Sequence, residues 1–169
     1  LLSILPEGGA AANTFSSLAR ALRLKDLYGE NLLLRHQADW VTGWFLNNWH
    51  WGEASNNIRL GWDLKNESWP EAIEKLPLKK SFPEIVNSGN IISKIAFRRA
   101  KQLDLPHDLL VIAGTTDSNA AVLAAKPNKA EGITVLGSTI VLKSFVEKPS
   151  SNTSFINGGF FVMSPKCIK

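Results

Sequence analysis

The chain has 169 residues, of which 44% are hydrophobic and 20% charged, the composition of an ordinary globular protein. Its net charge of +4 is small and its basic residues are dispersed, so we expect no nucleic-acid partner. Every apolar run is shorter than the roughly 18 residues of a membrane helix, so we expect no membrane partner. A single cysteine excludes an internal disulfide and fits a reducing compartment, the cytoplasm by default or the plastid in a plant.

Two amphipathic helices are predicted in the first third of the chain. Asn13 is a favoured N-cap residue for the first helix, and the second covers residues 37–46. In both, apolar side chains recur with the 3.6-residue period of a helix. The positions expected to face inward are Phe15, Leu18, Ala19 and Leu22 in the first helix, and Ala38, Val41, Thr42 and Phe45 in the second.

All six tryptophans lie between residues 40 and 69, an unusual concentration. This clustering predicts a large aromatic core or a stiff connecting region, and a platform that stacks on a sugar ring is the alternative. Residues 52–70 are rich in Gly, Asn and Trp, so we expect loops and short turns there.

The second half of the chain alternates helices with apolar strands. We expect a third helix over residues 93–103 and then, over residues 109–113, a short strand of the kind that is buried in a parallel sheet. A helix of small residues is expected over residues 119–125. This alternation indicates an α/β fold.

The strongest candidate site is the loop around Asp117, between the predicted strand and the small-residue helix. Ligands of open α/β sheets gather at the carboxyl ends of strands, where this loop lies. An aspartate there can accept a proton from a substrate hydroxyl, and the N-terminus of the helix offers N–H groups to an anion. The alternative is that Asp117 only caps the helix, and the two roles are compatible.

A second candidate is the turn Gly137-Ser138, which should join strands at residues 133–136 and 139–145 as a two-residue hairpin. Glycine permits close approach of the backbone, and exposed amides beside a hydroxyl can hold phosphate oxygens. Any hairpin needs such a turn, so the turn alone identifies no ligand.

The third candidate is the pair His36 and Asp39, which lie three residues apart on one helix face and are expected to pair with each other. The remaining histidines, His50 and His107, show no metal-ligand spacing, so no metal site is predicted from these side chains. We interpret the pair as a partly buried polar contact that fixes the helix.

Taken in order, several segments resemble motifs of the FGGY carbohydrate kinases. The resemblance covers about residues 18–148, and residues 36–44 together with Ser118 are most similar to the plant and cyanobacterial branch near xylulose and ribulose kinases. The matching segments are residues 55–59 (Ser-Asn-Asn-Ile-Arg), Trp62-Asp63 and Trp69-Pro70, residues 83–89 (Pro-Glu-Ile-Val-Asn-Ser-Gly), Leu105-Pro106, residues 114–121, and residues 136–139.

The resemblance implies an actin-like, ribonuclease H-like ATPase fold of two domains, incomplete in this chain. Residues 1–130 would form the C-terminal part of the first, sugar-binding domain. Residues 131–169 would form the truncated start of the second, ATP-binding domain.

The resemblance also implies roles for individual residues. Asp117 matches the general base that contacts the sugar and deprotonates its attacking hydroxyl, and Ser118 matches a neighbouring sugar contact. Gly137, Ser138 and Thr139 match the turn that meets the γ-phosphate of ATP. The implied cofactors are ATP and Mg²⁺, with no metal ligand assigned in this chain.

The implied activity is that of a ribulokinase or xylulokinase, the ATP-dependent phosphorylation of a pentulose such as D-ribulose or D-xylulose. The family's Asp-x-Gly-Thr strand and its adenosine pocket have no match here, and residues 150–169 match nothing expected. That tail suggests a misread intron, a frameshift or a divergent end. The alternative is therefore a catalytically inert, truncated product with at most weak sugar or partner binding. The sequence leaves the identity of the sugar and the oligomeric state open.

Overall fold

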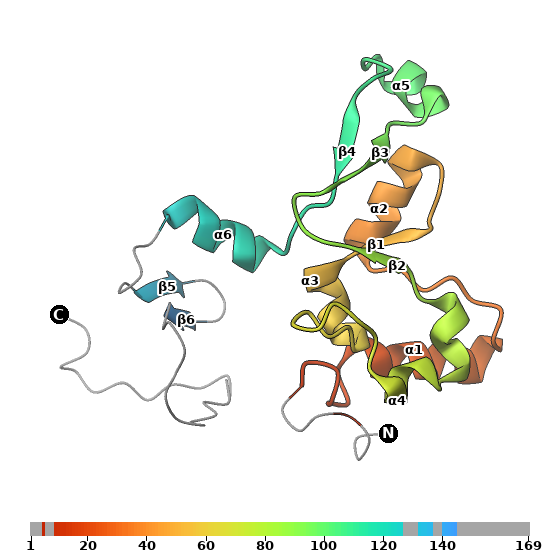
Figure 1. The fold of residues 1–169 in the computed structure, drawn as a ribbon, viewed down its shortest axis with the longest axis vertical. Coiled ribbons are helices and arrows are strands. Elements are labelled where there is room, and N and C mark those ends of the chain that lie inside the picture. Colours follow the sequence, from red (N-terminus) through yellow and green to blue (C-terminus); the bar gives the residue numbers. More distant parts are fainter. Residues whose placement is uncertain (1–4, 6–8, 127–131, 137–139, 145–169) are drawn as a thin grey trace. The chain divides into compact units, whose positions relative to one another are not determined.

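The computed structural model describes residue 5 and residues 9–126, 132–136 and 140–144 (Figure 1). The chain divides into two compact units, residues 1–116 and residues 117–169. The predicted kinase domain boundary near residue 130 stays a prediction. The first unit contains α1 (Ser17–Tyr28), α2 (Gln37–Leu46), β1 (Trp51–Glu53), α3 (Ala54–Asn57), a 3₁₀ helix (Ile58–Leu60), α4 (Glu71–Glu74), a second 3₁₀ helix (Pro77–Ser81), β2 (Glu84–Val86), β3 (Ile91–Lys94), α5 (Phe97–Leu103) and β4 (Leu110–Ile112). The second unit contains α6 (Asp117–Ala125), β5 (Gly132–Leu136) and β6 (Ile140–Ser144).

Helix α1 begins later than predicted. Its N-cap is Ser16, whose hydroxyl accepts a hydrogen bond from the backbone N–H of Ala19 at 3.1 Å. Asn13, the predicted cap, instead accepts from the N–H of Phe15 at 2.9 Å, in a turn that precedes the helix. Phe15 is 83% exposed, so its expected inward position is wrong.

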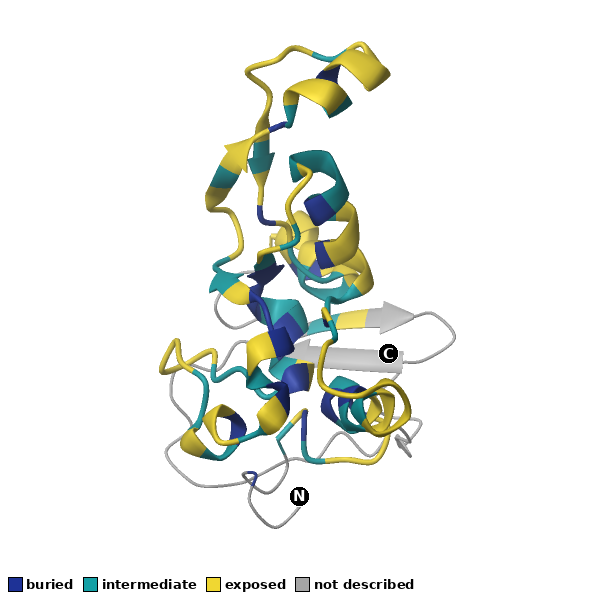
Figure 2. Ribbon diagram, turned by 90° about the vertical axis from the view of Figure 1, so that its right-hand side faces the viewer, coloured by how far each residue is buried: buried dark blue, intermediate teal, exposed yellow. Residues whose placement is uncertain are grey.

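The apolar core of the first unit is formed by residues of α1, α4, the two 3₁₀ helices and their connecting segments. Figure 2 colours the chain by burial, with buried residues in dark blue. Leu18, Ile73 and Leu78 are almost fully enclosed, so the core is small but well packed around them. The buried members of this cluster are Leu5, Ala11, Leu18, Ala21, Leu34, Leu60, Ile73, Leu78 and Phe82.

Helix α2 has the predicted bounds, and Thr42 and Phe45 are half-buried, but its two buried residues are not among those expected to face inward. Its buried residues are Asp39 and Gly43, whereas Val41 is 45% exposed and Ala38 is also exposed. A Cβ on Gly43 would lie 2.7 Å from Cγ of Trp49, so the missing side chain lets the Trp49 ring pack directly on the helix. This close packing and the hydrogen bonds of Asp39 override the apolar periodicity that predicted the inward face.

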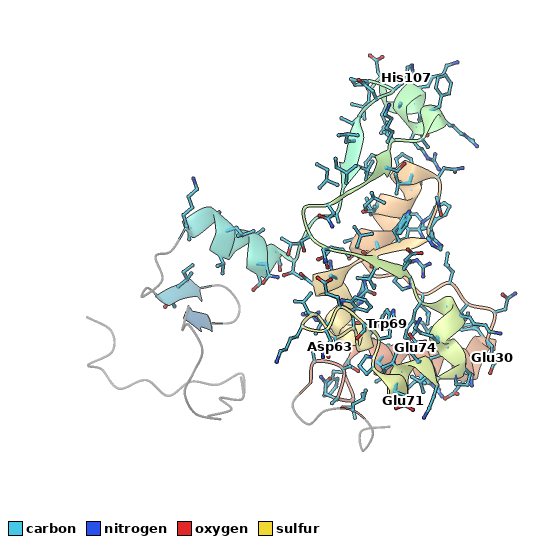
Figure 3. The ribbon with its side chains drawn as sticks, in the orientation of Figure 1. Glu30, Asp63, Trp69, Glu71, Glu74 and His107 are labelled. Atoms are coloured by element: carbon cyan, nitrogen blue, oxygen red, sulfur yellow. The ribbon has the colours of Figure 1, made fainter. Side chains whose placement is uncertain are left out.

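The tryptophans form several small contacts, which differs from the single aromatic core that was expected. Trp62 and Trp69 meet edge to face with ring centroids 5.2 Å apart, and Trp69 also contacts Phe82 at 5.1 Å (Figure 3 labels Trp69). The guanidinium of Arg99 lies 4.0 Å from the ring centroid of Trp44, a cation–π contact. These contacts join the helices to the loops beside them.

Each sheet among the described residues has two strands. Strand β1 pairs with β2 in parallel, and β3 pairs with β4 in antiparallel orientation. The predicted helix over residues 93–103 is therefore wrong in its first part, because residues 91–94 form β3 and the helix starts only at Phe97. Strand β4 is also antiparallel and exposed, with Leu110 at 46% and Ile112 at 52%, which corrects the buried parallel strand that was predicted.

In the second unit, α6 starts at Asp117, two residues before its predicted start. Strands β5 and β6 pair antiparallel in register from Gly132 opposite Ser144 to Leu136 opposite Ile140, which confirms the predicted hairpin. Three residues separate Leu136 from Ile140, one more than the predicted two-residue turn. None of the helices in the described part of the chain has the length and apolarity needed to cross a bilayer.

Candidate functional site

A cleft of about 210 Å³ opens in the first unit between α2, β1, α3 and the residues that follow β4. We call it the acidic cleft because its lining residues include Asp39 and Glu53. Gly114 and Thr115, the first residues of the loop that the sequence singles out, also line it. Its lining residues are Ala38, Asp39, Thr42, Trp51, Gly52, Glu53, Asn56, Ile92, Ile112, Ala113, Gly114 and Thr115.

The carboxylate of Glu53 is held by four hydrogen bonds. One oxygen accepts from the backbone N–H of Ser55 at 2.7 Å and from the hydroxyl of Ser88 at 2.5 Å. The other accepts from the backbone N–H and the side-chain amide of Asn56, at 2.9 and 2.8 Å. Glu53 therefore caps α3 and ties β1 to the segment after β2, with its charge fully matched by donors.

Asp39 is 3% exposed and makes one hydrogen bond with each oxygen. Its Oδ1 accepts from the backbone N–H of Glu53 at 2.9 Å, and its Oδ2 accepts from the side-chain amide of Asn57 at 3.0 Å. Burial raises the pKa of the Asp39 carboxyl, and these two hydrogen bonds oppose the rise. Asp39 thus joins α2 to the corner between β1 and α3 and forms part of the cleft wall.

The expected hydrogen-bonded pair of His36 and Asp39 is not formed. The Nε2 atom of His36 is buried without a hydrogen-bond partner, and Asp39 bonds to Glu53 and Asn57 instead. Desolvation lowers the pKa of His36, and the nearby charge of Asp39 only partly opposes that shift. The two residues therefore interact through charge alone.

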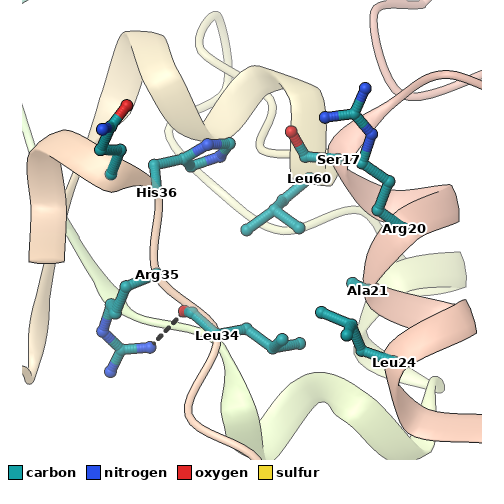
Figure 4. A pocket seen from close by; sticks show the side chains of 9 residues that line it. Ser17, Arg20, Ala21, Leu24, Leu34, Arg35, His36 and Leu60 are labelled. Carbon is teal, nitrogen blue, oxygen red and sulfur yellow. Dashed lines mark hydrogen bonds between the residues drawn. The ribbon is translucent and has the colours of Figure 1, made fainter. Parts of the chain in front are cut away.

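His36 belongs to a second cleft, of about 220 Å³, between α1 and residues 34–37, which we call the basic cleft (Figure 4). The guanidinium of Arg35 donates to the carbonyls of Trp49 at 2.5 Å and Ser81 at 2.9 Å, among others. These hydrogen bonds occupy donors that could otherwise bind a ligand in the cleft. The lining residues are Ser17, Arg20, Ala21, Leu24, Leu34, Arg35, His36, Gln37 and Leu60.

Asp117 and Ser118 belong to the second unit, whereas Gly114 and Thr115 of the same predicted loop belong to the first. Asp117 is the first residue of α6 and is exposed, and its Oδ1 accepts from the backbone N–H of Ser118 at 2.6 Å. An N-cap side chain bonds to the second or third N–H of its helix, so this contact differs from ordinary capping. Gly137, Ser138 and Thr139, the predicted phosphate turn, lie outside the described residues.

Sequence reasoning missed Glu53 and Ser88 as members of the site. Ser88 and the segment that starts at Ser55 were noted separately as kinase-like motifs, and the structure brings them together at Glu53, where their hydroxyl oxygens lie 3.4 Å apart. Glu53 and Ser88 are 35 residues apart, so no local sequence pattern predicts their contact. Within the described part of the chain, no group of His, Cys, Asp or Glu side chains could hold a metal ion.

No protein-family model matches this chain. In fold it is similar to the crystal structure of a carbohydrate kinase from Novosphingobium aromaticivorans, with a TM-score of 0.62 and 22% identity, over 73% of this chain and 29% of that one. It is also similar to the crystal structure of a ligand-bound xylulose kinase from Lactobacillus acidophilus, with a TM-score of 0.71 and 13% identity, over 86% of this chain and 32% of that one.

These likenesses establish the fold of the matched part, which mixes helices and strands as part of a carbohydrate kinase does. They agree with the sugar-kinase fold that the sequence motifs imply. They do not bear on the plant and cyanobacterial branch. The chain spans about a third of the length of these kinases.

Proposed function

We propose that this chain is part of an ATP-dependent sugar kinase that phosphorylates a pentulose, D-ribulose or D-xylulose. The observation that carries the proposal is the likeness in fold to a xylulose kinase over 86% of the chain. The sequence motifs at residues 55–59, 83–89 and 114–121, which follow one another in the order found in carbohydrate kinases, support it independently. So does the polar cleft lined by Gly114 and Thr115, which precede Asp117 in the chain.

Asp117 is the proposed general base. Its exposed carboxylate would take the proton from the sugar hydroxyl while that oxygen forms a bond to the γ-phosphorus and the bond to the leaving ADP breaks. General-base catalysis typically contributes 10²–10⁴-fold, or about 3–5 kcal/mol of the barrier. Ser118, the next residue, would contact the sugar beside it.

ATP supplies the phosphoryl group, and Gly137, Ser138 and Thr139 are the proposed contacts of its γ-phosphate. Mg²⁺ would spread the charge of the phosphates during transfer. Mg²⁺ is commonly held largely by substrate phosphates, which here would be those of ATP.

The remaining proposals follow from the same resemblance. The complete fold would be an actin-like enzyme of two domains, with the boundary near residue 130. The branch is the plant and cyanobacterial one, and the compartment is the cytoplasm or, in a plant, the plastid.

A second candidate is a protein that binds the sugar but does not transfer phosphate. The observation that favours it is the polar cleft itself, because all its lining residues lie within residues 38–115 of the first unit.

The experiment that tests the proposal is a coupled assay of ADP release by the purified protein with ATP and Mg²⁺. The expected result is ADP release that requires D-ribulose or D-xylulose. ADP release that is the same with and without sugar would contradict the kinase. Absence of release, together with measurable sugar binding, would favour the second candidate.

A further inference from the structure

The acidic cleft has the side-chain chemistry of a site for a neutral polyhydroxylated molecule. Its polar side chains include the hydroxyl of Thr42 and the amide of Asn56, in addition to the carboxylates of Asp39 and Glu53. None of its lining residues is a lysine or an arginine. A phosphate group would therefore meet two carboxylates and no cation, which disfavours nucleotides and phosphorylated sugars.

The negative charge of the cleft is also moderated. Four donors surround the carboxylate of Glu53, and the buried carboxyl of Asp39 has a raised pKa. Asp39 uses each oxygen for only one hydrogen bond, and a carboxylate oxygen can accept more than one. The cleft can therefore accept hydrogen bonds from hydroxyls without requiring a cationic ligand.

The cleft is also lined by apolar residues. One is Trp51, whose ring meets the ring of His50 edge to face with centroids 4.9 Å apart. Ile92 and Ala113 are two others. Aromatic and aliphatic side chains beside a few fixed polar groups are usual in small-molecule sites, and the C–H face of a sugar fits such a wall.

The cleft has room for a small ligand. Its volume is about 210 Å³. That space suits a monosaccharide.

We infer that the acidic cleft is the subsite for the unphosphorylated sugar, with the side chains of Asp39, Thr42 and Asn56 bonding to its hydroxyls and Trp51 covering its C–H face. The inference rests on the proposed function, because it takes a pentulose as the occupant. It assigns sugar contacts to residues far in sequence from Asp117 and Ser118.

The test is an NMR titration of the full 169-residue chain, labelled with ¹⁵N at its tryptophan indoles, with D-ribulose. A Trp51→Phe variant identifies the Trp51 resonance. We expect that resonance to shift saturably, while D-ribulose 5-phosphate leaves it unmoved. Absence of a D-ribulose shift, or an equal response to the phosphorylated sugar, would overturn the inference.

Two matched pairs of variants locate the site. Thr42→Val removes a cleft hydroxyl and should raise the Kd for D-ribulose about two- to tenfold, the cost of one hydrogen bond. Thr14→Val makes the same change at an exposed turn and should leave the Kd unchanged. Ile92→Phe should fill the cleft and abolish binding, whereas Ile91→Phe, at a neighbouring residue that is 59% exposed, should not. Equal effects within both pairs would overturn the inference.

The remaining outcomes separate this inference from the proposed function. Sugar-dependent ADP release without any shift of Trp51 would leave the kinase standing and refute the subsite. A saturable shift without ADP release would support the subsite and refute the kinase. A stronger response to 1,5-diaminopentane than to D-ribulose would show a cation site and overturn the inference.

Discussion

The two clefts of the first unit are nearly equal in volume, about 210 and 220 Å³. They differ in the sign of their charged side chains and in the hydrogen bonds that these side chains make. In the acidic cleft, backbone and amide donors converge on Asp39 and Glu53, which remain in the cleft wall. In the basic cleft, the guanidinium of Arg35 donates hydrogen bonds to backbone carbonyls. The Nε2 atom of His36 is buried without a hydrogen-bond partner. In both clefts, charged groups already bond to the protein, so a ligand of the acidic cleft depends on the capacity of a carboxylate oxygen to accept more than one hydrogen bond.

The largest effect on stability is expected from Asp39→Ala. It leaves the backbone N–H of Glu53 and one of the two side-chain N–H groups of Asn57 without an acceptor, and each buried unsatisfied donor costs about 1–3 kcal/mol. We expect the free energy of unfolding, measured with urea, to fall by about 2–5 kcal/mol. Asp39→Asn keeps one acceptor oxygen and should lose clearly less. Equal losses in the two variants would contradict this account of the acidic cleft.

The next effect is expected from adding a methyl group to Gly43. The new Cβ would overlap the ring of Trp49, so Gly43→Ala should lower the free energy of unfolding by about 1–3 kcal/mol, the usual cost of overpacking. Gly114→Ala is the matched control, because its Cβ meets no atom within 4 Å. If thermal unfolding showed Gly114→Ala to be the more damaging change, the packing of α2 would be described incorrectly.

The two clefts should give stability opposite dependences on pH. Burial raises the pKa of Asp39 above its ordinary 3.8, so the folded state holds this proton more tightly than the unfolded state does. Stability therefore falls as the pH rises from the unfolded pKa of 3.8 through the higher pKa of the folded state. Desolvation lowers the pKa of His36 below its ordinary 6.5, so the unfolded state binds this proton more tightly and stability falls as the pH drops below 6.5.

Urea unfolding at several pH values separates these two contributions. Relative to Asp39→Asn, the wild type should lose stability as the pH rises from about 4. Relative to His36→Phe, which cannot titrate, it should lose stability as the pH falls below 6.5. Differences of the same sign in both comparisons would show that the buried charges are assigned wrongly.

The smallest effect is expected at an exposed carboxylate. Glu71 on α4 (Figure 3) forms an ion pair with Lys75 one helical turn later, and both side chains are largely exposed. Such pairs contribute at most about 0.5 kcal/mol, so Glu71→Gln should change the free energy of unfolding by less than that. A loss as large as that of Asp39→Ala would remove the distinction between buried and exposed carboxylates.

The sequence predicts those elements whose stability is local. The bounds of α2 and the pairing of β5 with β6 are confirmed, because helix periodicity and hairpin patterning act over a few residues. Strand β3 was misread as the start of a helix. Its backbone pairs with β4, about 20 residues away, and no nearby residue reveals that partner.

In the candidate site too, the features that depend on neighbouring residues were predicted and those that depend on distant residues were not. The loop at Gly114 and Thr115 was located from sequence because a strand, a glycine and hydroxyl residues stand together there. Glu53 was missed because its role depends on contacts with Asp39 and Ser88, 14 and 35 residues away. Partial burial of Asp39 was expected, but its hydrogen-bond partners Glu53 and Asn57 were missed for the same reason, because they lie 14 and 18 residues away.

The most direct test of the proposed kinase follows the phosphate itself. The protein is incubated with ATP labelled in its γ-phosphate, Mg²⁺ and D-ribulose or D-xylulose, and labelled pentulose phosphate is measured for the wild type and for Asp117→Asn. The account predicts labelled product from the wild type and a loss of about 10²–10⁴-fold in the variant, because the carboxylate that takes the proton is gone. Equal yields from the two proteins, or no labelled sugar from the wild type, would contradict it.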